Sequence, residues 1–328
     1  MKAAMPSIRA GRLALACAAL VATIVAAPAA EFPERPVTLV TSAPAGGGGD
    51  VLTRYLADKL KTASGATFVI ENKPGAAGNI ATVAVTHARP DGYTLLAAPS
   101  STVIANKFVI KDTGYDAMRD LAPVAPFLKV GLALIAGPST HATTVKDFVA
   151  ELKARTGKPM FYGVPTTSSL FGAQVFLTMT GLSGTRVNYK GMGDAASGVT
   201  AGELDFAFVD ATLAIGQAKQ GRVRILAVSS AERLAIAPEL PTVKESGIGD
   251  FDYVNFWAVW APAGTPQPVI DTLSGWINRV VALPETGRFF LSQGAEPLAA
   301  TPAQLAAMMR THNDLWVQIA RTTNLEPQ

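Results

Sequence analysis

The stretch SAPAGGGGD (residues 42–50) has the clearest capacity to bind a ligand, because four consecutive glycines leave backbone N–H groups available. A hydrophobic run precedes it and an amphipathic run follows it, which is the strand–loop–helix order of many phosphate sites. The Walker pattern requires Gly-Lys-Ser/Thr after the loop, whereas Asp50 stands there. The dinucleotide fingerprint also fails, because its last glycine is replaced by Val51 or Leu52. We therefore predict that this loop binds no nucleotide.

The same loop is suited to another kind of anion. A helix N-terminus favours negative charge, and backbone N–H groups satisfy a carboxylate without an arginine. Asp50 is predicted to be the N-cap of the helix, accepting hydrogen bonds from the first-turn amides. The alternative is that the glycines only form a tight turn. Four in a row cost more conformational entropy than a turn requires, which favours close approach of a ligand.

Signatures of catalysis are weak in this sequence. No G-x-S-x-G is present, and His87, His141 and His312 lie far apart without metal-binding spacing. Each histidine is predicted to lie at the surface or at a helix end. The acidic residues are dispersed, with no pair that suggests perturbed titration. We expect a protein that is not an enzyme and has no metal site and no cofactor. The competing hypothesis is an exported enzyme that uses Asp210 with a hydroxyl or His87.

Hydroxyl side chains gather after two predicted strands, at residues 100–102 and 166–169. One residue of each cluster is expected to cap the following helix, which leaves further hydroxyls to face a cleft. Tyr189 and Asp210 end two other predicted strands. Asp210 either accepts a hydrogen bond from a ligand amine or water, or caps the next helix.

These residues must be positioned by alternating strands and helices. In the first block, strands at 36–42, 67–72 and 94–98 alternate with helices at 50–65 and 79–88, which predicts a parallel sheet covered by helices on both faces. A second block follows from about residue 132, with strands at 132–137, 159–163, 185–189, 204–210 and 223–229 and helices at 144–155, 168–181, 193–202 and 211–221.

The chain then continues with an apolar strand at 256–262 and two helices, around 267–282 and 302–321. Two blocks with a return of the chain predict two lobes joined by more than one crossing, with a ligand cleft at the carboxyl ends of the strands. Aromatic residues of the returning strand, among them Trp257, are expected to pack in the core or to form a wall of the cleft.

Export is indicated by the first thirty of the 328 residues. A basic start, a short apolar segment and Ala27-Pro28-Ala29 predict a cleaved signal peptide. The only cysteine, Cys17, lies inside it, and Ala14 stands where a lipoprotein signal would need leucine. Its removal leaves 25 basic and 25 acidic residues, so no field for nucleic acid or an anionic membrane is expected. The expected location is a Gram-negative periplasm.

Four motifs in order, AGGGGD (45–50), PGAAGN (74–79), PDGYTLL (90–96) and APAGTP (261–266), carry a resemblance that covers nearly the whole chain after the signal peptide. The chain resembles the Bug family of periplasmic solute receptors, the binding components of tripartite tricarboxylate transporters. The resemblance implies an α/β, two-lobe type II periplasmic-binding-protein fold that closes on a small carboxylate in an interlobe cleft. It also implies delivery of that ligand to the membrane subunits of the transporter.

The expected organisation is a signal peptide (1–30), a first lobe formed by 31–130 and 260–328, and a second lobe formed by 131–259. The resemblance and the hydroxyl clusters together give the following expected ligand-binding residues: Ala45, Gly46, Gly47, Gly48, Gly49, Gly75, Ala76, Gly78, Asn79, Ser100, Ser101, Thr167, Ser168, Tyr189 and Asp210. A monomer is expected. A sensory adaptor that passes the ligand signal to a membrane partner is the alternative function.

Two loops depart from the family pattern. Members commonly have PFPPGGPTD where this chain has SAPAGGGGD, and GSSGNGTSSH where it has GVPTTSSL. Pro165 lies inside the second loop, and Leu170 replaces the histidine. The first loop is therefore expected to be more flexible than in relatives, and the second stiffer.

Overall fold

The computed structural model describes residues 32–155, 157–323 and 327. Residues 35–328 form one compact unit. The expected signal peptide (1–30), with Cys17, lies outside the described residues. Among the helices of the described part, none combines the length and the apolar character needed to cross a membrane.

Three parallel strands build the first half of the sheet, as the alternating pattern predicts. β1 (Val37–Thr41) lies between β2 (Phe68–Asn72) and β3 (Thr94–Pro99). The connecting helices are α2 (Gly48–Ser64) and α3 (Asn79–Thr86). One short helical element, η1 (Ala76–Gly78), precedes α3, and three more follow β3, namely α4 (Ser100–Val103), η2 (Asn106–Phe108) and α5 (Ala117–Asp120). α2 turns Leu52, Leu56 and Leu60 into the core, four residues apart on one helix face.

Two long antiparallel strands join the halves of the molecule. β9 (Val254–Pro262) pairs with β3 and with the first part of β4 (Leu121–Ala136), and the last part of β4 pairs with β7 (Phe206–Asp210) and β8 (Arg224–Val228). The parallel arrangement therefore holds for the three strands of the first block, for which it was predicted, but not for these pairs. The sequence pattern indicated only the second half of β4, because Pro123 and Pro126 interrupt the first half. The register shifts beside both prolines.

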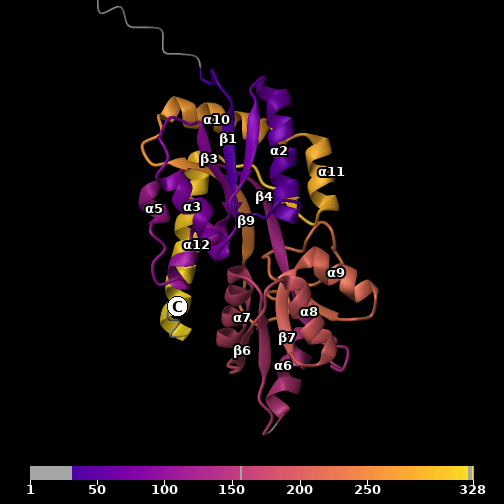
Figure 1. Cartoon of the computed structure of the whole chain (residues 1–328). Helices are drawn as coiled ribbons and strands as arrows, with labels where there is room; N and C mark the ends of the chain where they lie inside the picture. Colours follow the sequence, from indigo (N-terminus) through magenta and orange to yellow (C-terminus); the bar gives the residue numbers. More distant parts are fainter. Residues whose placement is uncertain (1–31, 156, 324–326, 328) are drawn as a thin grey trace, which may run out of the picture. The chain divides into compact units, whose positions relative to one another are not determined.

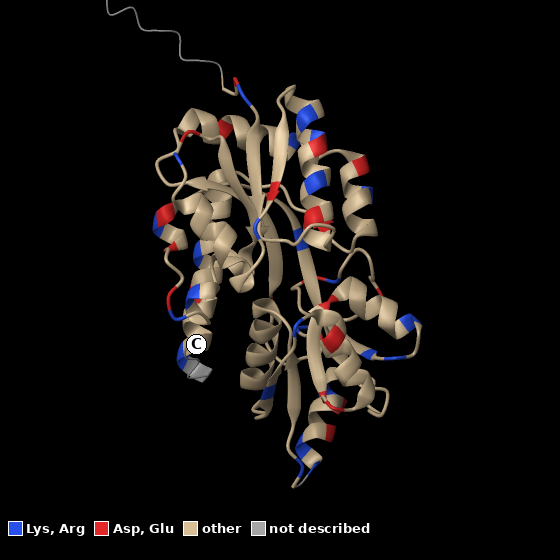
Figure 2. Cartoon of the chain, viewed as in Figure 1, with Lys and Arg blue, Asp and Glu red and all other residues tan. Residues whose placement is uncertain are grey.

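The second half repeats the alternation of strand and helix. β5 (Phe161–Val164) pairs in parallel with β6 (Thr185–Asn188) and β7. The helices of this half are α6 (Val145–Ala154), α7 (Thr167–Thr180), α8 (Met192–Ala201) and α9 (Ala211–Lys219). Figure 1 shows the two lobes with β4 running from one to the other. The central strands carry few charged residues, which concentrate on the surrounding helices and loops (Figure 2).

The C-terminal segment contains α10 (Gln267–Val281), α11 (Pro284–Ser292), the two-residue strand β10 (Glu296–Pro297) and α12 (Pro302–Thr323). α12 contributes Leu305 and Met309 to the core of the first lobe and Trp316 to the core of the second. The lobe boundaries, 31–130 with 260–328 and 131–259, stay a prediction.

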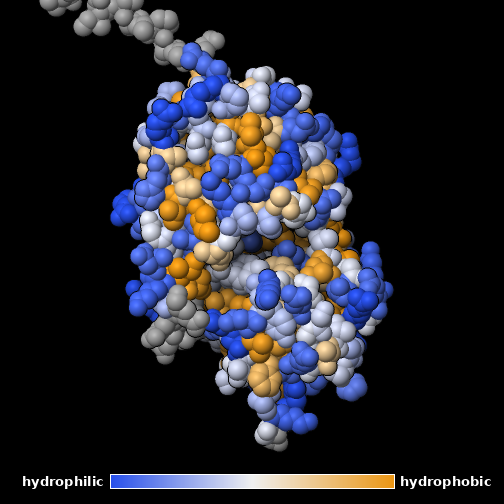
Figure 3. Space-filling view, viewed as in Figure 1, coloured by the Kyte–Doolittle hydropathy of each residue, from blue (hydrophilic) through white to orange (hydrophobic). Residues whose placement is uncertain are grey.

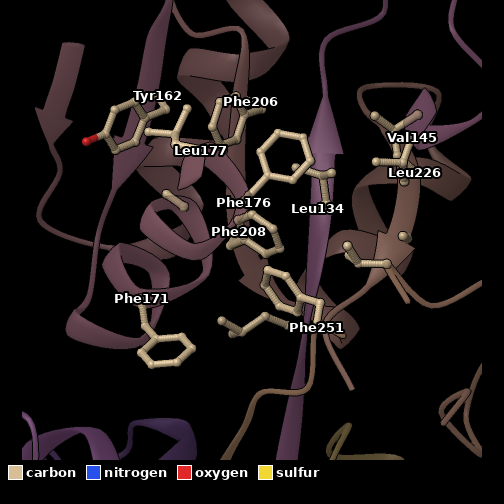
Figure 4. Close-up of a cluster of buried hydrophobic side chains, with 14 of the residues drawn as sticks. Leu134, Val145, Tyr162, Phe171, Phe176, Leu177, Phe206, Phe208, Leu226 and Phe251 are labelled. Atoms are coloured by element: carbon tan, nitrogen blue, oxygen red, sulfur yellow. The ribbon is translucent and has the colours of Figure 1, made fainter. Parts of the chain in front are cut away.

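Aromatic rings fill the core of the second lobe (Figure 4). Phe208 of β7 stacks on Phe251 at 5.8 Å and meets Phe176 of α7 edge-on at 6.1 Å. Gly172 brings α7 against this ring, because a Cβ there would lie 2.7 Å from Cγ of Phe208. The apolar pattern of α7 thus serves to bury its rings against the sheet.

Replacing Phe208 by alanine leaves a cavity that the close-packed neighbours cannot fill. We expect Phe208→Ala to lower the free energy of unfolding by about 3–5 kcal/mol in urea titrations followed by circular dichroism. Val69→Ala, at a side chain in the edge strand β2 that is 48% exposed, is the control and should change stability by less than about 1 kcal/mol. Equal effects would contradict the packing described here.

Candidate ligand-binding site

A cavity of about 470 Å³ lies where the strands of both blocks end. It is lined by Ser42, Pro44, Pro74, Gly75, Ala77, Gly78, Pro99, Ser101, Thr102, Val130, Pro165, Thr166, Thr167, Ser168, Lys190, Met192, Asp210, Asn255 and Trp257. Figure 3 shows the surface hollowed between the two lobes. Because parallel strands end at the same edge of a sheet, the loops that follow them meet here.

The expected site residues divide into three groups. Those that line the cavity are Gly75, Gly78, Ser101, Thr167, Ser168 and Asp210. Tyr189 lines a neighbouring cavity of about 260 Å³, which shares Ala77 and the segment 165–167 with the first. The expected residues that line neither of these two cavities are Ala45, Gly46, Gly47, Gly48, Gly49, Ala76, Asn79 and Ser100.

Asp50 does not cap α2, so that prediction is wrong. The helix begins at Gly48, and the Asp50 carboxylate, buried in the first turn, folds the loop back by accepting from the N–H of Gly46 at 2.9 Å. It also accepts from Arg54 Nε at 2.9 Å and from Asn72 Nδ2 at 2.7 Å. The hydrogen bond from Arg54 is the main cause that lowers the pKa of Asp50 to about 2. Asp50 therefore ties the glycine loop to β2.

At two positions of this loop the structure requires glycine. Gly46 has a φ of +78°, a region in which residues with a Cβ are strained. At Gly49 a Cβ would overlap the indole of Trp257, lying 2.8 Å from its Cζ2 atom. The indole thus packs on the first turn of α2 while it lines the cavity. Gly48 has no neighbour within 4 Å of an added Cβ.

The PGAAGN loop holds a strained backbone at the cavity. Residues 75–78 all have positive φ, and Ala76 (46°) and Ala77 (51°) do so with a side chain, at about 1–2 kcal/mol each. The carbonyl of Ala77 accepts from Thr102 Oγ1 and from Asn106 Nδ2, each at 3.2 Å, and these bonds hold the turn. Strain of this kind persists where surrounding groups impose it, often at ligand sites.

The strained turn leaves two successive donors unused. Within the described part of the chain, the N–H groups of Ala76 and Ala77 make no hydrogen bond. Consecutive N–H groups in such a turn form a concavity that suits an anion. Ala77 lines both cavities, so its N–H lies at their junction, whereas Ala76 lines neither cavity.

Asn255, at the start of β9, is a candidate that sequence reasoning missed. Its Oδ1 accepts from Ser100 Oγ at 3.0 Å and from the N–H of Ser101 at 3.2 Å. Ser100 also accepts from the N–H of Phe256 at 3.3 Å, so it orients the amide rather than facing the cavity. Among the described residues Asn255 Nδ2 has no acceptor, and the side chain lines the cavity as a donor. The only signal for it in the sequence was that Asn255 is a polar residue directly before the apolar run FWAVWAP.

The second lobe contributes the N-terminal end of α7. Thr166 is the N-cap: its Oγ1 accepts from the N–H of Ser169 at 3.2 Å and lies 2.9 Å from Ser168 Oγ. This confirms that one hydroxyl of the cluster caps the helix. The hydroxyl of Thr167 has no partner among the described residues and lines both cavities. The positive end of a 14-residue helix thus faces the same space as the donors of the first lobe.

Asp210 ends β7 and precedes α9, but its side chain makes no capping hydrogen bond. Of the two roles predicted for Asp210, capping of the next helix is therefore wrong, and acceptance of a hydrogen bond from a ligand stays a prediction. Its N–H donates to Met192 Sδ at 3.2 Å, and burial raises the pKa of its carboxyl to about 6. Lys190 lines the same cavity, and no ion pair within 4.0 Å joins the two or involves either with another described residue.

The histidines do not form a site. His87 is exposed at the end of α3, where its Nδ1 lies 2.9 Å from the carbonyl of Val83. His312 differs from its prediction, because it is half-buried beside the rings of Tyr253 and Phe256 and burial lowers its pKa to about 4. No cluster of three or more potential metal-binding side chains occurs among the described residues.

Comparison with known proteins decides the family. The sequence model of the "Tripartite tricarboxylate transporter family receptor" matches residues 52–325. The chain belongs to this receptor family. A UPF0065 protein of Bordetella bronchiseptica is 34% identical over 319 residues, covering 96% of this chain and 93% of that protein. Protein BugT of Bordetella pertussis is 30% identical, covering 89% and 90%.

Solved structures of similar proteins show that the fold of this chain is that of periplasmic binding proteins. R. palustris Rpa4515, solved with adipate, superposes with a TM-score of 0.79 at 29% identity, covering 91% of this chain and all of that one. The periplasmic binding protein BugD superposes with a TM-score of 0.75 at 29% identity, covering 90% and 100%. The resemblance to Bug receptors and the two-lobe periplasmic-binding-protein fold are therefore confirmed.

The contact between Gly49 and Trp257 gives one prediction for this receptor. Gly49→Ala should force the indole to move, lowering the free energy of unfolding by about 1–3 kcal/mol and shifting tryptophan fluorescence. Gly48→Ala is the matched control at an open position and should leave both nearly unchanged. If both variants behave alike in urea titrations, the indole does not require the glycine.

The hydrogen bonds of Asp50 predict a pH dependence. Because its pKa is lowered from 3.8 to about 2 on folding, its carboxylate stabilises the fold above about pH 3.8, and this stability is lost as the pH falls through 2. Asp50→Asn should lower the free energy of unfolding by about 1–3 kcal/mol at pH 7, and the difference from wild type should vanish near pH 2. Asp58→Asn, exposed on the same helix, should change little. A difference that stays constant with pH would refute this role.

Proposed function

We propose that this receptor is exported and binds a small organic carboxylate by closure of its two lobes, then delivers it to the membrane subunits of a tripartite transporter. Export through a cleaved signal peptide at 1–30 and a monomeric state are parts of the proposal. Family membership and the presence of adipate in Rpa4515 support the ligand class. No catalytic step is proposed.

The observation that carries the proposal is the set of unpaired donors at the cavity. Among the described residues, the N–H of Ala77 and the amide Nδ2 of Asn255 come from the half of the molecule that contains β3, with which β9 pairs. The hydroxyl of Thr167 and the N-terminal end of α7 come from the other half. A carboxylate is an acceptor without donors, so it matches such a set, and an anion is favoured at a helix N-terminus.

Closure follows from the distribution of these donors over two lobes. A ligand that contacts both lobes at once binds the closed form better than the open form and shifts the equilibrium toward it. The lobes are joined by β4 and by the segment that leads into β9, and the cavity lies beside these crossings. The required movement is therefore a bend at these two crossings, and α12, which packs on both cores, must move with it.

Carboxylates should stabilise the receptor against heat. At about one hundred times its dissociation constant a ligand adds about 2.7 kcal/mol, which raises the melting temperature by several degrees. A thermal-shift screen of mono- and dicarboxylates, amino acids and aromatic acids tests this, with sugars and cations as controls. If sugars or cations raised the melting temperature while no carboxylate did, the proposal would fail.

A matched pair of variants locates the ligand found in that screen. Thr167→Ala removes a hydroxyl at the cavity and should raise the dissociation constant about tenfold, as measured by calorimetry. Thr178→Ala removes an exposed hydroxyl of the same helix and should leave it unchanged. The reverse order of effects would place the ligand elsewhere.

The enzyme hypothesis makes a different prediction for Asp210. Under that hypothesis Asp210→Asn should abolish turnover of a substrate, whereas a receptor shows no turnover to lose.

A further inference from the structure

We propose that Asp210 selects carboxylates that also carry an ammonium group, with Lys190 contacting the ligand carboxylate, so that the receptor prefers amino-carboxylates to their desamino counterparts. This rests on the proposed function, because it names the ligand class of the same cavity. The two residues are the only charged side chains among those that line the cavity.

Asp210 has the properties of an acceptor without a donor. Asp210 is the last residue of β7 and pairs with Leu132 of β4, which fixes its backbone at the cavity edge. Its side chain neither caps α9 nor pairs with any lysine or arginine among the described residues. The Asp210 side chain is half-buried. A carboxylate that is partly removed from water without a partner is unfavourable, so a ligand group that donates to it gains more than the same group would in water.

The neighbouring groups explain why the donor should come from the ligand. On the side of β1, β3 and β9 the cavity is lined by Ser42, Ser101, Thr102, Asn255, Trp257 and other uncharged residues, none of them a cation. From the second lobe the titratable groups at the cavity are Lys190 and Asp210 themselves. Coulombic stabilisation by Lys190 does not contribute to the shifted pKa of Asp210, for which burial is the cause.

A negative side chain in a cavity for carboxylates also acts as a filter. A ligand whose second group is another carboxylate is repelled by Asp210, whereas an ammonium group is attracted. Lys190, at the rim between β6 and α8, has no acid to neutralise it and attracts the carboxylate of either ligand. Lys190 thus contributes to the affinity for both classes, and Asp210 discriminates between them.

The test uses ligand pairs that differ only in the amino group, such as aspartate and succinate, glutamate and glutarate, or alanine and propionate. Calorimetry with the mature receptor at pH 7.5 should show that the amino member of at least one pair binds tenfold tighter or more, about 1.4 kcal/mol. Asp210→Asn should remove that preference by weakening the amino ligand, while the desamino ligand binds as well or better. Lys190→Gln should weaken both members of the pair alike.

Asp194→Asn is the matched control, because it removes an exposed carboxylate of α8 outside the cavity and should change neither ligand. If Asp210→Asn does not fold, the affinity of the wild-type receptor for the ligands is measured at a series of pH values instead. The ammonium and α-carboxylate groups of an amino acid such as alanine keep their charge between pH 7.5 and 5, whereas Asp210, with a pKa of about 6, becomes neutral. The affinity for the amino member should therefore fall several-fold over this range.

Three results would overturn the inference. Desamino acids that bind as tightly as amino acids would show that Asp210 does not select, while the carboxylate receptor itself would stand. Binding of the amino member that does not change between pH 7.5 and pH 5 would show that its ammonium group does not contact Asp210. Unchanged binding of both ligands by Lys190→Gln would remove its assigned contact. If no carboxylate of either kind bound, the proposed function would fail first.

Discussion

The hydroxyl of Ser229 holds together the two segments that cross between the lobes. Its Oγ accepts from the N–H of Leu132 in β4 at 3.0 Å and donates to the carbonyl of Tyr253 at 2.7 Å, just before β9. The backbone of Ser229 bonds to the same two residues. Because this side chain is fully buried, loss of either bond would leave an unsatisfied polar group in a region without water. The cavity lies beside this crossing, because Asp210, which lines it, pairs with Leu132.

From that crossing the positions of the donors follow. β4 changes partner from β9 to β7 and β8 next to Leu132, so Asp210 at the end of β7 and Asn255 at the start of β9 are brought to one cavity from distant parts of the sequence. The PGAAGN loop joins them through Ala77, whose carbonyl is held by Thr102 from the end of β3. The site is thus a consequence of where strands end rather than of one binding motif.

Much of the fold could be predicted from sequence, because apolar strands and amphipathic helices alternate and their order limits the topology. The site was harder. Hydroxyls at strand ends were predictable, but the need for Gly49 depends on Trp257, two hundred residues away, and Gly78 is enclosed by Ser42 and Thr102. The buried carboxylate of Asp50 and the half-buried His312 were misjudged for the same reason: a local pattern does not reveal the tertiary neighbour that decides burial.

Different groups at the cavity are suited to binding a carboxylate and to discriminating between carboxylate ligands. Backbone N–H groups, hydroxyls and the end of α7 are dipoles, so they can hold a carboxylate without adding net charge to the cavity. They are also insensitive to what else the ligand carries. The two formal charges, Lys190 and Asp210, lie at the same cavity without pairing with each other, and thus keep their full interaction for the ligand. The proposed selection by Asp210 therefore acts in addition to the affinity that the dipoles provide.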